Sequence, residues 1–326
     1  MSSSQNKEPL LHIVGIQSPI IWENPKANRL AFSESIQKCI KEKVDIDLIV
    51  LPEVFTTGFS MNIDSIDSWK SGETIDWMRD LAKKYNVAIT GSVAFRFEDG
   101  MGRNRSLFVK PDGSFEFYDK RHLFTFGKEN EHYEGGEARK VVEFRGWRIL
   151  LQICYDLRFP CFARNSISNT YDVALYVANW PEVRRHPWRT LLQARAIENQ
   201  CYVVGVNRTG SDPNKIAYRG DSLGVDPYGN ILSDAQMGDS ITLVCNRSTL
   251  EEFRSKFPVL EDADLIRSIQ PAPQTLRATL LKSVFAGDVH SCNQEVNVMC
   301  AFIGNHRFKI HHVTHNWVFI HNSHCP

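Results

Sequence analysis

Cys154, Lys120 and Glu53 are the residues of this chain whose types and positions best support covalent chemistry. Each stands at the end of a strand-like apolar segment. A cysteine attacks as the thiolate, so it needs a base or a positive charge nearby. Glu53 could take the thiol proton, and Lys120 could stabilise the negative charge that develops on a substrate oxygen. Such a set would hydrolyse a carbon–nitrogen bond through a covalent thioester.

The surroundings of Cys154 predict where its thiol lies. An apolar segment ends at this residue, a polar turn follows, and Pro160 is placed to begin a helix. The pattern therefore predicts a strand-to-helix elbow that exposes a nucleophile at the rim of a sheet. Backbone N–H groups at such an elbow, that of Tyr155 among them, would point at the attacked oxygen. We expect Arg158 to be structural, bonding carboxylates or carbonyls below the elbow.

Each of these residue types also has an ordinary structural interpretation. A cysteine that follows an apolar strand is commonly a buried core thiol. A glutamate in such a place is commonly solvated or caps a helix, and a lysine in a polar segment is commonly on the surface. Spacing alone leaves both interpretations open.

The elements that would position these residues recur between residues 11 and 245. Strand-like segments cover residues 11–17, 47–52, 87–95, 106–110, 115–118, 147–154, 173–179, 201–207, 220–225 and 241–245. Helical patterns cover residues 25–43, 73–85, 188–199 and 248–257. A Pro-Asp-Gly turn at residues 111–113 predicts a hairpin. This mixture of βα alternation and β-hairpins favours an α/β layered sandwich over a doubly wound sheet.

Composition excludes several classes of partner. Lys+Arg and Asp+Glu both number 38, so there is no overall basic field for nucleic acid or anionic lipid. No run reaches the roughly 18 apolar residues of a membrane span, and the first residues lack the apolar core of a secretory signal. The eight cysteines include no Cys-x-x-Cys pair, which is typical of reduced thiols. We expect a cytoplasmic protein that binds neither nucleic acid nor membrane.

The composition changes near residue 271. Residues 286–326 hold seven of the eleven histidines and three of the eight cysteines. They show no established metal-ligand spacing, so we expect no metal, although a zinc-binding or partner-binding segment remains an alternative. We expect a disordered start at residues 1–9, one domain at residues 10–270, and a poorly ordered, atypical extension at residues 271–326.

Three short segments resemble the catalytic blocks of the nitrilase, or carbon–nitrogen hydrolase, superfamily. They are Leu-Pro-Glu at residues 51–53, Tyr-Asp-Lys-Arg-His-Leu-Phe at residues 118–124 and Cys-Tyr-Asp-Leu-Arg-Phe-Pro at residues 154–160. Residue type, order and spacing all agree with the family. The resemblance runs from about residue 11 to about residue 264.

The resemblance implies a role for each residue. Glu53 would be the general base, Lys120 the transition-state stabiliser and Cys154 the nucleophile. The family also has a second glutamate, a position that Glu129 fits and for which Glu131 competes; it would orient Lys120 or the substrate amide. The implied fold is an α-β-β-α four-layer sandwich that associates as a dimer or larger, without metal or organic cofactor.

One branch of the family is more similar than the others. The segment Tyr-Val-Ala-Asn-Trp-Pro-Glu at residues 176–182 is similar to that of ω-amidases. This implies that the substrate is a small amide, and that ammonia is released from the side-chain amide of 2-oxoglutaramate or 2-oxosuccinamate. Two alternatives stay open: an amidase acting on deaminated glutathione or an N-carbamoyl compound, and a catalytically idle binding module.

A short dicarboxylate-like amide also needs a partner for its far carboxylate. Arginine binds carboxylates in a bidentate manner. We expect Arg184, with Arg185 beside it, to border the pocket, and Trp180, Phe59 and Phe124 to form its walls. The ordinary alternatives are a solvated loop arginine and core aromatic residues.

Overall fold

The computed structural model describes residues 10–42 and 45–263, and beyond them only the backbone of four short strands. The chain divides into two compact units, Met1–Leu265 and Ile266–Pro326. The expected disordered start and the domain boundary near residue 270 lie outside the described residues, so both stay predictions. In the second unit, β16 (Val289–Ser291), β17 (Val298–Ile303), β18 (His306–Val313) and β19 (Asn316–His321) pair in that order as an antiparallel sheet.

The first unit contains both strands and helices. Its strands are β1 (Leu10–Ile16), β2 (Leu48–Val50), β3 (Asp67–Ser68), β4 (Ala88–Arg96), β5 (Gly102–Val109), β6 (Phe115–Asp119), β7 (Lys140–Phe144), β8 (Trp147–Ile153), β9 (Val173–Ala178), β10 (Tyr202–Asn207), β11 (Thr209–Ser211), β12 (Ala217–Arg219), β13 (Leu223–Val225), β14 (Ile231–Asp234) and β15 (Ser240–Asn246). Its α-helices are α1 (Pro25–Glu42), α2 (Glu73–Tyr85), α3 (Glu129–His132), α4 (Pro160–Ala163), α5 (Arg185–Asn199) and α6 (Arg247–Lys256). Short 3-10 helices are η1 (Ile63–Ser65), η2 (Thr125–Gly127), η3 (Cys154–Arg158), η4 (Ile167–Asn169) and η5 (Glu182–Arg184).

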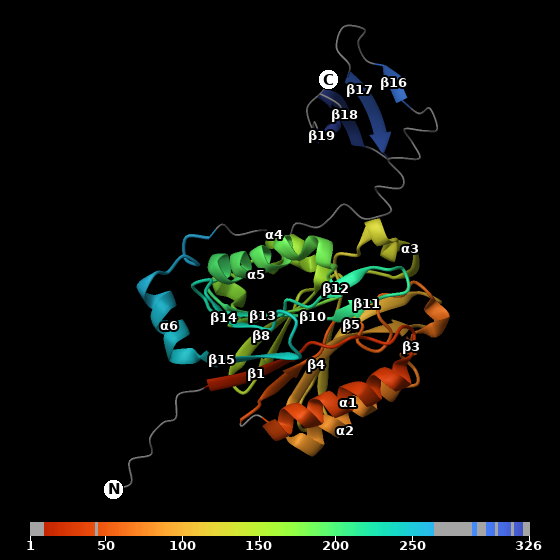
Figure 1. Ribbon diagram of the computed structural model, residues 1–326. Coiled ribbons are helices and arrows are strands. Elements are labelled where there is room, and N and C mark those ends of the chain that lie inside the picture. The colour runs from red at the N-terminus through yellow and green to blue at the C-terminus, as the bar shows by residue number, and fades with distance from the viewer. Residues whose placement is uncertain are drawn as a thin grey trace. The chain divides into compact units, whose positions relative to one another are not determined.

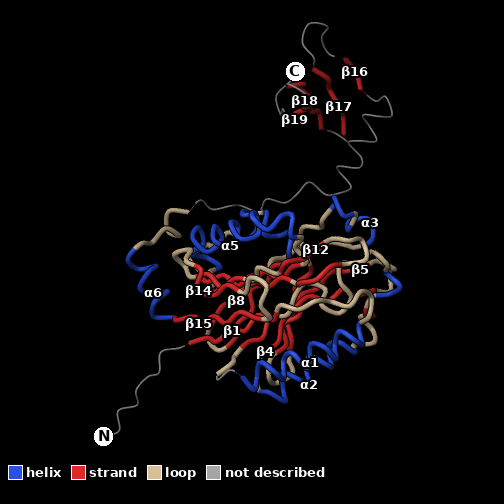
Figure 2. Tube along the Cα trace, viewed as in Figure 1, coloured by secondary structure: helices blue, strands red, loops and turns tan. Residues whose placement is uncertain are grey.

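These elements form four layers. One sheet has the strand order β15-β1-β2-β4-β5-β6, with β3 paired to β4, and the other has the order β14-β13-β10-β9-β8-β7. The two sheets face each other, α1 and α2 cover the outer face of the first, and α5 covers the outer face of the second (Figures 1 and 2). The predicted α-β-β-α sandwich is therefore confirmed.

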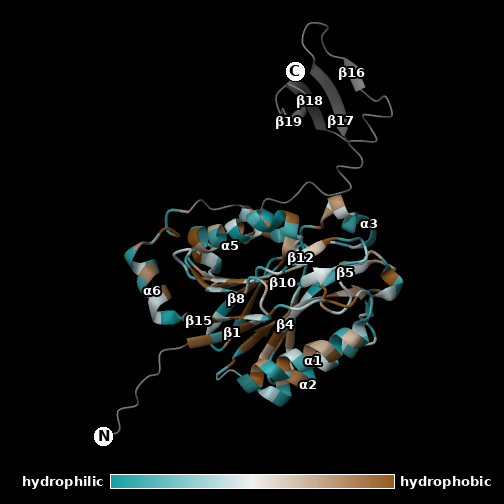
Figure 3. Cartoon of the chain, in the orientation of Figure 1, coloured by the Kyte–Doolittle hydropathy of each residue, from teal (hydrophilic) through white to brown (hydrophobic). Residues whose placement is uncertain are grey.

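The residues of β8 show why the layers form. Ile149, Leu151 and Ile153 belong to the core between the two sheets, whereas Leu150 belongs to the core that contains Trp188 of α5. Successive side chains of a strand point to opposite faces, so a strand that is apolar throughout must be covered on both sides. Figure 3 shows the same arrangement: the central strands are largely brown, and the covering helices mix brown and teal.

The sequence pattern predicted most of the elements that reach the site. Helix α2 has the predicted bounds, and the turn at residues 111–113 joins β5 to β6 as an antiparallel hairpin. The predicted start of α5 was three residues too late, and the short strands β3, β7, β11, β12 and β14 were not predicted. In the described part of the chain, every helix is too short or too polar to span a bilayer.

Candidate active site

Cys154 lies at the junction of β8 and η3, and α4 begins shortly afterwards at Pro160. The predicted strand-to-helix elbow is therefore present. The backbone φ of Cys154 is +44°, a left-handed conformation that residues with a Cβ rarely adopt. Such strain persists where surrounding contacts hold it, which is frequently at functional sites. The side chain of Cys154 lines a pocket, which it enters from the end of the second sheet.

Glu53 reaches the same pocket from the end of the first sheet, three residues after β2. Its side chain is fully buried, and its two carboxylate oxygens have different partners. Oε1 accepts hydrogen bonds from Nζ of Lys120 at 2.9 Å and from Nδ2 of Asn104 at 2.8 Å. Oε2 accepts the backbone N–H of Asn179, the residue after β9, at 2.7 Å. One carboxylate thus joins the ends of the two sheets.

Lys120 directly follows β6 and is as deeply buried as Glu53. Its Nζ lies 3.0 Å from both carboxylate oxygens of Glu129, in addition to its contact with Glu53. Glu129 also accepts the backbone N–H of Phe124 at 2.6 Å, which fixes its rotamer. Glu131, the competing candidate, is exposed. The geometry brings Glu129, and not Glu131, against the lysine.

The electrostatics of this cluster distinguish its members. Burial by itself lowers the pKa of Lys120, but the charges of Glu129 and Glu53 outweigh it, so the net pKa is raised. Burial raises the pKa of Glu129, although Lys120 lowers it. Burial and then the charge of Glu53 raise the pKa of Cys154 well above its ordinary value, with Lys120 opposing. Lys120 is therefore cationic at neutral pH, and Cys154 rests as a thiol.

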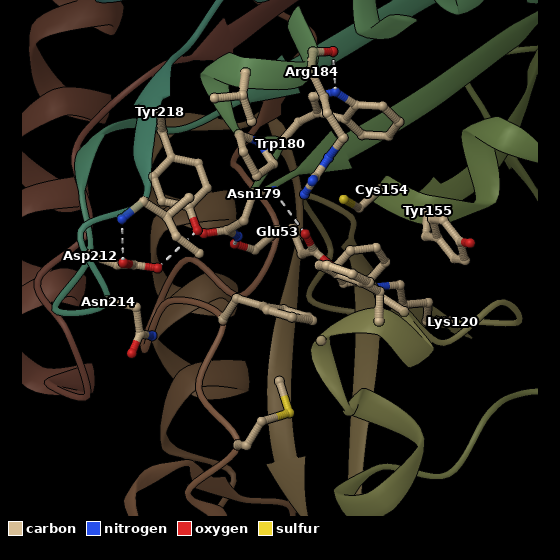
Figure 4. Close-up of a pocket in the computed structure, with 18 of the residues that line it drawn as sticks. Glu53, Lys120, Cys154, Tyr155, Asn179, Trp180, Arg184, Asp212, Asn214 and Tyr218 are labelled. Carbon is tan, nitrogen blue, oxygen red and sulfur yellow. Dashed lines mark hydrogen bonds and ion pairs between the residues drawn. The ribbon is translucent and has the colours of Figure 1, made fainter.

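The pocket lined by Glu53, Lys120 and Cys154 has a volume of about 550 Å³. Trp180, Phe124, Phe59 and Arg184, which were predicted from the sequence to surround a substrate, all line it. Tyr155 lines it too, and its ring packs edge-on against Phe124. Figure 4 shows the Cys154 sulfur and the Arg184 side chain directed into this space, with Glu53 and Lys120 beneath.

Two arginines in the pocket have no carboxylate partner among the described residues. The guanidinium of Arg184 lies over the ring of Phe124 at 5.5 Å, and that of Arg158 lies over the ring of Trp180 at 4.9 Å. The expectation that Arg158 bonds acids or carbonyls below the elbow was wrong, because its side chain lines the pocket instead. Arg185, by contrast, is paired with Asp221.

Several lining residues come from the β11–β12 hairpin, which sequence reasoning missed. Asp212, Asn214 and Tyr218 form one wall, and the Tyr218 hydroxyl donates to Oδ2 of Asp212 at 3.1 Å (Figure 4). The strands of this hairpin have only three residues each and no apolar alternation, so no periodic signal marked them. Asn104 is buried in β5 beside Arg103, Arg105 and Ser106, so its polar type did not set it apart in the sequence.

The described residues offer no cluster of three or more His, Cys, Asp or Glu side chains that could hold a metal ion. The histidine-rich and cysteine-containing segment at residues 286–326 lies outside the described side chains. The polar groups of the pocket include a thiol, carboxylates, an ammonium, guanidinium groups, amides and two phenolic hydroxyls. This donor set suits acid–base and nucleophilic chemistry on an anionic organic substrate.

Comparison with known proteins defines the class to which this fold and site belong. The sequence profile of the carbon–nitrogen hydrolase family matches residues 13–254, about three-quarters of the chain. The chain belongs to this family, and it is therefore a hydrolase of carbon–nitrogen bonds.

Individual relatives narrow the class. The chain is 46% identical to the ω-amidase YafV of Escherichia coli over 261 residues, which cover 79% of this chain and 99% of that protein. It is 34% identical to the 2-oxoglutaramate amidase of Bacillus subtilis, covering 71% of this chain and 91% of the relative. A crystal structure of a CN-hydrolase superfamily protein from Xanthomonas campestris, which has an arsenic adduct in its active site, superposes with a TM-score of 0.75 at 41% identity. That match covers 79% of this chain and 99% of the other.

Proposed function

We propose that this chain is an ω-amidase that hydrolyses the side-chain amide of 2-oxoglutaramate or 2-oxosuccinamate, giving the dicarboxylate and ammonia. One observation carries the proposal. The pocket that contains Cys154 and the Glu53–Lys120 ion pair also contains Arg158 and Arg184, two guanidinium groups without a carboxylate partner among the described residues. A substrate with an amide at one end and a carboxylate at the other matches both halves of this site. The names of the two curated relatives support the same substrate class.

The first half of the reaction forms a thioester. Glu53 takes the proton of Cys154 as the sulfur attacks the amide carbon, and the carbonyl electron pair moves to oxygen. Nζ of Lys120 and the backbone N–H of Tyr155 hold this oxyanion. The intermediate then collapses, the carbon–nitrogen bond breaks, and the leaving nitrogen takes the proton from Glu53 and departs as ammonia.

The second half repeats these steps with water. Glu53 takes a proton from a water molecule as its oxygen attacks the thioester carbon, and the same donors hold the second oxyanion. The carbon–sulfur bond breaks, the sulfur recovers the proton from Glu53, and the acid product leaves. Lys120 stays protonated throughout because Glu129 and Glu53 raise its pKa, so it serves as a fixed positive charge and Glu53 as the proton carrier.

Arg184 and Arg158, which also line the pocket, would bind the carboxylate end of the substrate. Arg184 and Arg158 each lie over an aromatic ring and keep their N–H edges available for a carboxylate, which a guanidinium can bind through two parallel hydrogen bonds. The faces of Trp180 and Phe124 restrict both arginine side chains. The pair therefore selects an amide that ends in a carboxylate.

A substrate panel tests this proposal. We expect kcat/KM for 2-oxoglutaramate and 2-oxosuccinamate to exceed that for deaminated glutathione and for an N-carbamoyl amino acid by at least about 100-fold, since a ligand that leaves the two half-buried guanidiniums without a carboxylate loses their hydrogen bonds. A preference for either of the last two compounds would assign the chain to another amidase specificity. A folded chain that hydrolyses none of these compounds, and no other short amide, would be an idle binding module.

We further propose that the protein works in the cytoplasm as a homodimer. Cys154, Cys161, Cys201 and Cys245 are free thiols, and Cys161 is exposed, which suits a reducing compartment. Sedimentation of the purified full chain gives the mass of the assembly, and a monomer at micromolar concentration would contradict the dimer.

A further inference from the structure

Asp156, two residues after the nucleophile, is fully buried and accepts four hydrogen bonds. Its Oδ1 accepts the backbone N–H of His122 at 3.0 Å and lies 2.8 Å from Nδ1 of the same residue. Its Oδ2 accepts the hydroxyl of Tyr118 at 2.8 Å and the backbone N–H of Ile153 at 2.9 Å. The last contact closes one half of a capping box at the start of η3.

These four contacts come from two segments that each carry a proposed catalytic residue. Tyr118 and His122 lie two positions before and two positions after Lys120. Ile153 immediately precedes Cys154, and Asp156 belongs to the turn that follows it. One carboxylate thus joins the segment on both sides of the lysine, through the Tyr118 hydroxyl and the His122 N–H, to the backbone on both sides of the cysteine.

An aromatic contact joins the same two segments. The rings of His122 and Phe159 are stacked, with centroids 3.8 Å apart and planes inclined by 6°. Asp156 itself does not line the pocket, and within the described residues its only ionisable partner in salt-bridge range is His122. Burying a carboxylate without a lysine or arginine is expensive unless its oxygens are fully hydrogen-bonded, as they are here.

We propose that Asp156 is a positioning residue, which sets the placement of Lys120 relative to Cys154 through Tyr118, His122 and Ile153. The inference rests on the proposed function, because it assumes that both residues act on one substrate carbonyl. A displacement of about 1 Å between reacting groups costs about 100-fold in rate. The carboxylate therefore matters to the reaction without touching the substrate.

The substitution Asp156→Asn tests this directly. Whichever way the new amide is oriented, its NH2 faces a backbone N–H that cannot accept, either that of His122 or that of Ile153. We expect kcat for 2-oxoglutaramate to fall about 100-fold while KM stays within about threefold. Asp172→Asn is the matched control. Asp172 is similarly buried and accepts Arg148 N at 3.0 Å, but its charged partners are Arg247 and Arg254, and it does not line the pocket.

A second readout does not need a substrate. Lys120 opposes the raised pKa of Cys154, so a lysine that moves away should slow alkylation of Cys154 by iodoacetamide. We expect at least about a fivefold slower rate at pH 8 in Asp156→Asn and an unchanged rate in Asp172→Asn. If the wild type does not release ammonia from 2-oxoglutaramate, the proposed function fails, while alkylation still decides whether Asp156 positions Lys120.

A gentler variant covers the case in which Asp156→Asn does not fold. Tyr118→Phe keeps the buried ring and removes only the hydroxyl, so we expect kcat to fall about tenfold with KM retained. In a folded double variant with Asp156→Asn, the two effects should not add, because both act through one contact. Unchanged kcat and alkylation in Tyr118→Phe, or losses in Asp156→Asn that only match those of Asp172→Asn, would overturn the proposal.

Discussion

Lys120 donates a 2.9 Å hydrogen bond from Nζ to Oε1 of Glu53, and neither side chain is more than 1% exposed. The bond spans 67 residues of sequence and joins the ends of β2 and β6. Glu129 contacts the same Nζ, so two carboxylates share one ammonium in the interior. Because two buried carboxylates depend on this single ammonium, Lys120 is needed both for the stability of the fold and for the proposed reaction.

Removing the lysine should destabilise the protein in a pH-dependent way. Lys120→Ala leaves two buried carboxylates without a cation, and we expect the free energy of unfolding to fall by about 3–5 kcal/mol at pH 8. Glu129 already has a raised pKa, and loss of Lys120 raises it further, so the folded state binds protons that the unfolded state does not. Stability of the variant should therefore increase as the pH falls from 8 to 6, measured by urea unfolding at each pH. If the stability of the variant does not depend on pH over this range, the claim that Lys120 compensates the charges of both Glu53 and Glu129 is wrong.

The second glutamate should act through the position of the lysine. In Glu129→Gln the remaining Glu53–Lys120 ion pair has no net charge, so the fold should survive. Nζ of Lys120 loses one of its two charged partners, however, and we expect kcat to fall about 100-fold because the lysine is then less precisely placed. Glu131→Gln, an exposed position on the same short helix, is the control and should match the wild type. Steady-state ammonia release measures both. Equal activity of the two variants would remove Glu129 from the site.

The thiol should become reactive only at high pH. Burial and then the charge of Glu53 raise the pKa of Cys154 well above the ordinary thiol value of about 8.5. Below that pKa the thiolate fraction rises tenfold per pH unit, so the rate of alkylation by iodoacetamide should still be rising at pH 9. Cys161→Ser removes from the assay the background thiol that is exposed among the described residues. A rate that reaches a plateau below pH 7 would show a resting thiolate and would contradict Glu53 as the proton acceptor.

We expect Arg184 to bind the substrate carboxylate and so to favour amides that have a carboxylate over amides that do not. We expect Arg184→Met to lower kcat/KM for 2-oxoglutaramate about 10- to 100-fold, the value of one or two charge-assisted hydrogen bonds. Butyramide, which has the amide but no carboxylate, serves as the internal control and should lose less than about threefold. Parallel losses on both substrates would show that Arg184 shapes the pocket and does not bind the carboxylate.

The sequence predicted the parts of the site that depend on local patterns. An apolar segment, a polar turn and Pro160 were enough to place Cys154 at an elbow, and strand ends marked Glu53 and Lys120. The direction of the Arg158 side chain could not be predicted from local patterns. Its guanidinium lies over the ring of Trp180, a residue that is brought next to it only by the fold.

The contacts that complete the site are non-local. Asn104 donates to Glu53, which lies 51 residues away, and Asn179 does so from 126 residues away. The β11–β12 hairpin is held by contacts of Asp212 with Ile216 and Tyr218, which no hydrophobic period signals. Sheet pairing, rather than local propensity, brings these groups together.

The most direct test of the central claim is ammonia release from 2-oxoglutaramate by the wild type beside Cys154→Ala. The account predicts turnover by the wild type and a loss of at least about 1,000-fold in kcat in the variant, with the fold retained, because covalent attack is then impossible. Turnover that persists in a folded Cys154→Ala protein would contradict a thioester mechanism, and a folded wild type that releases no ammonia would contradict the proposed substrate.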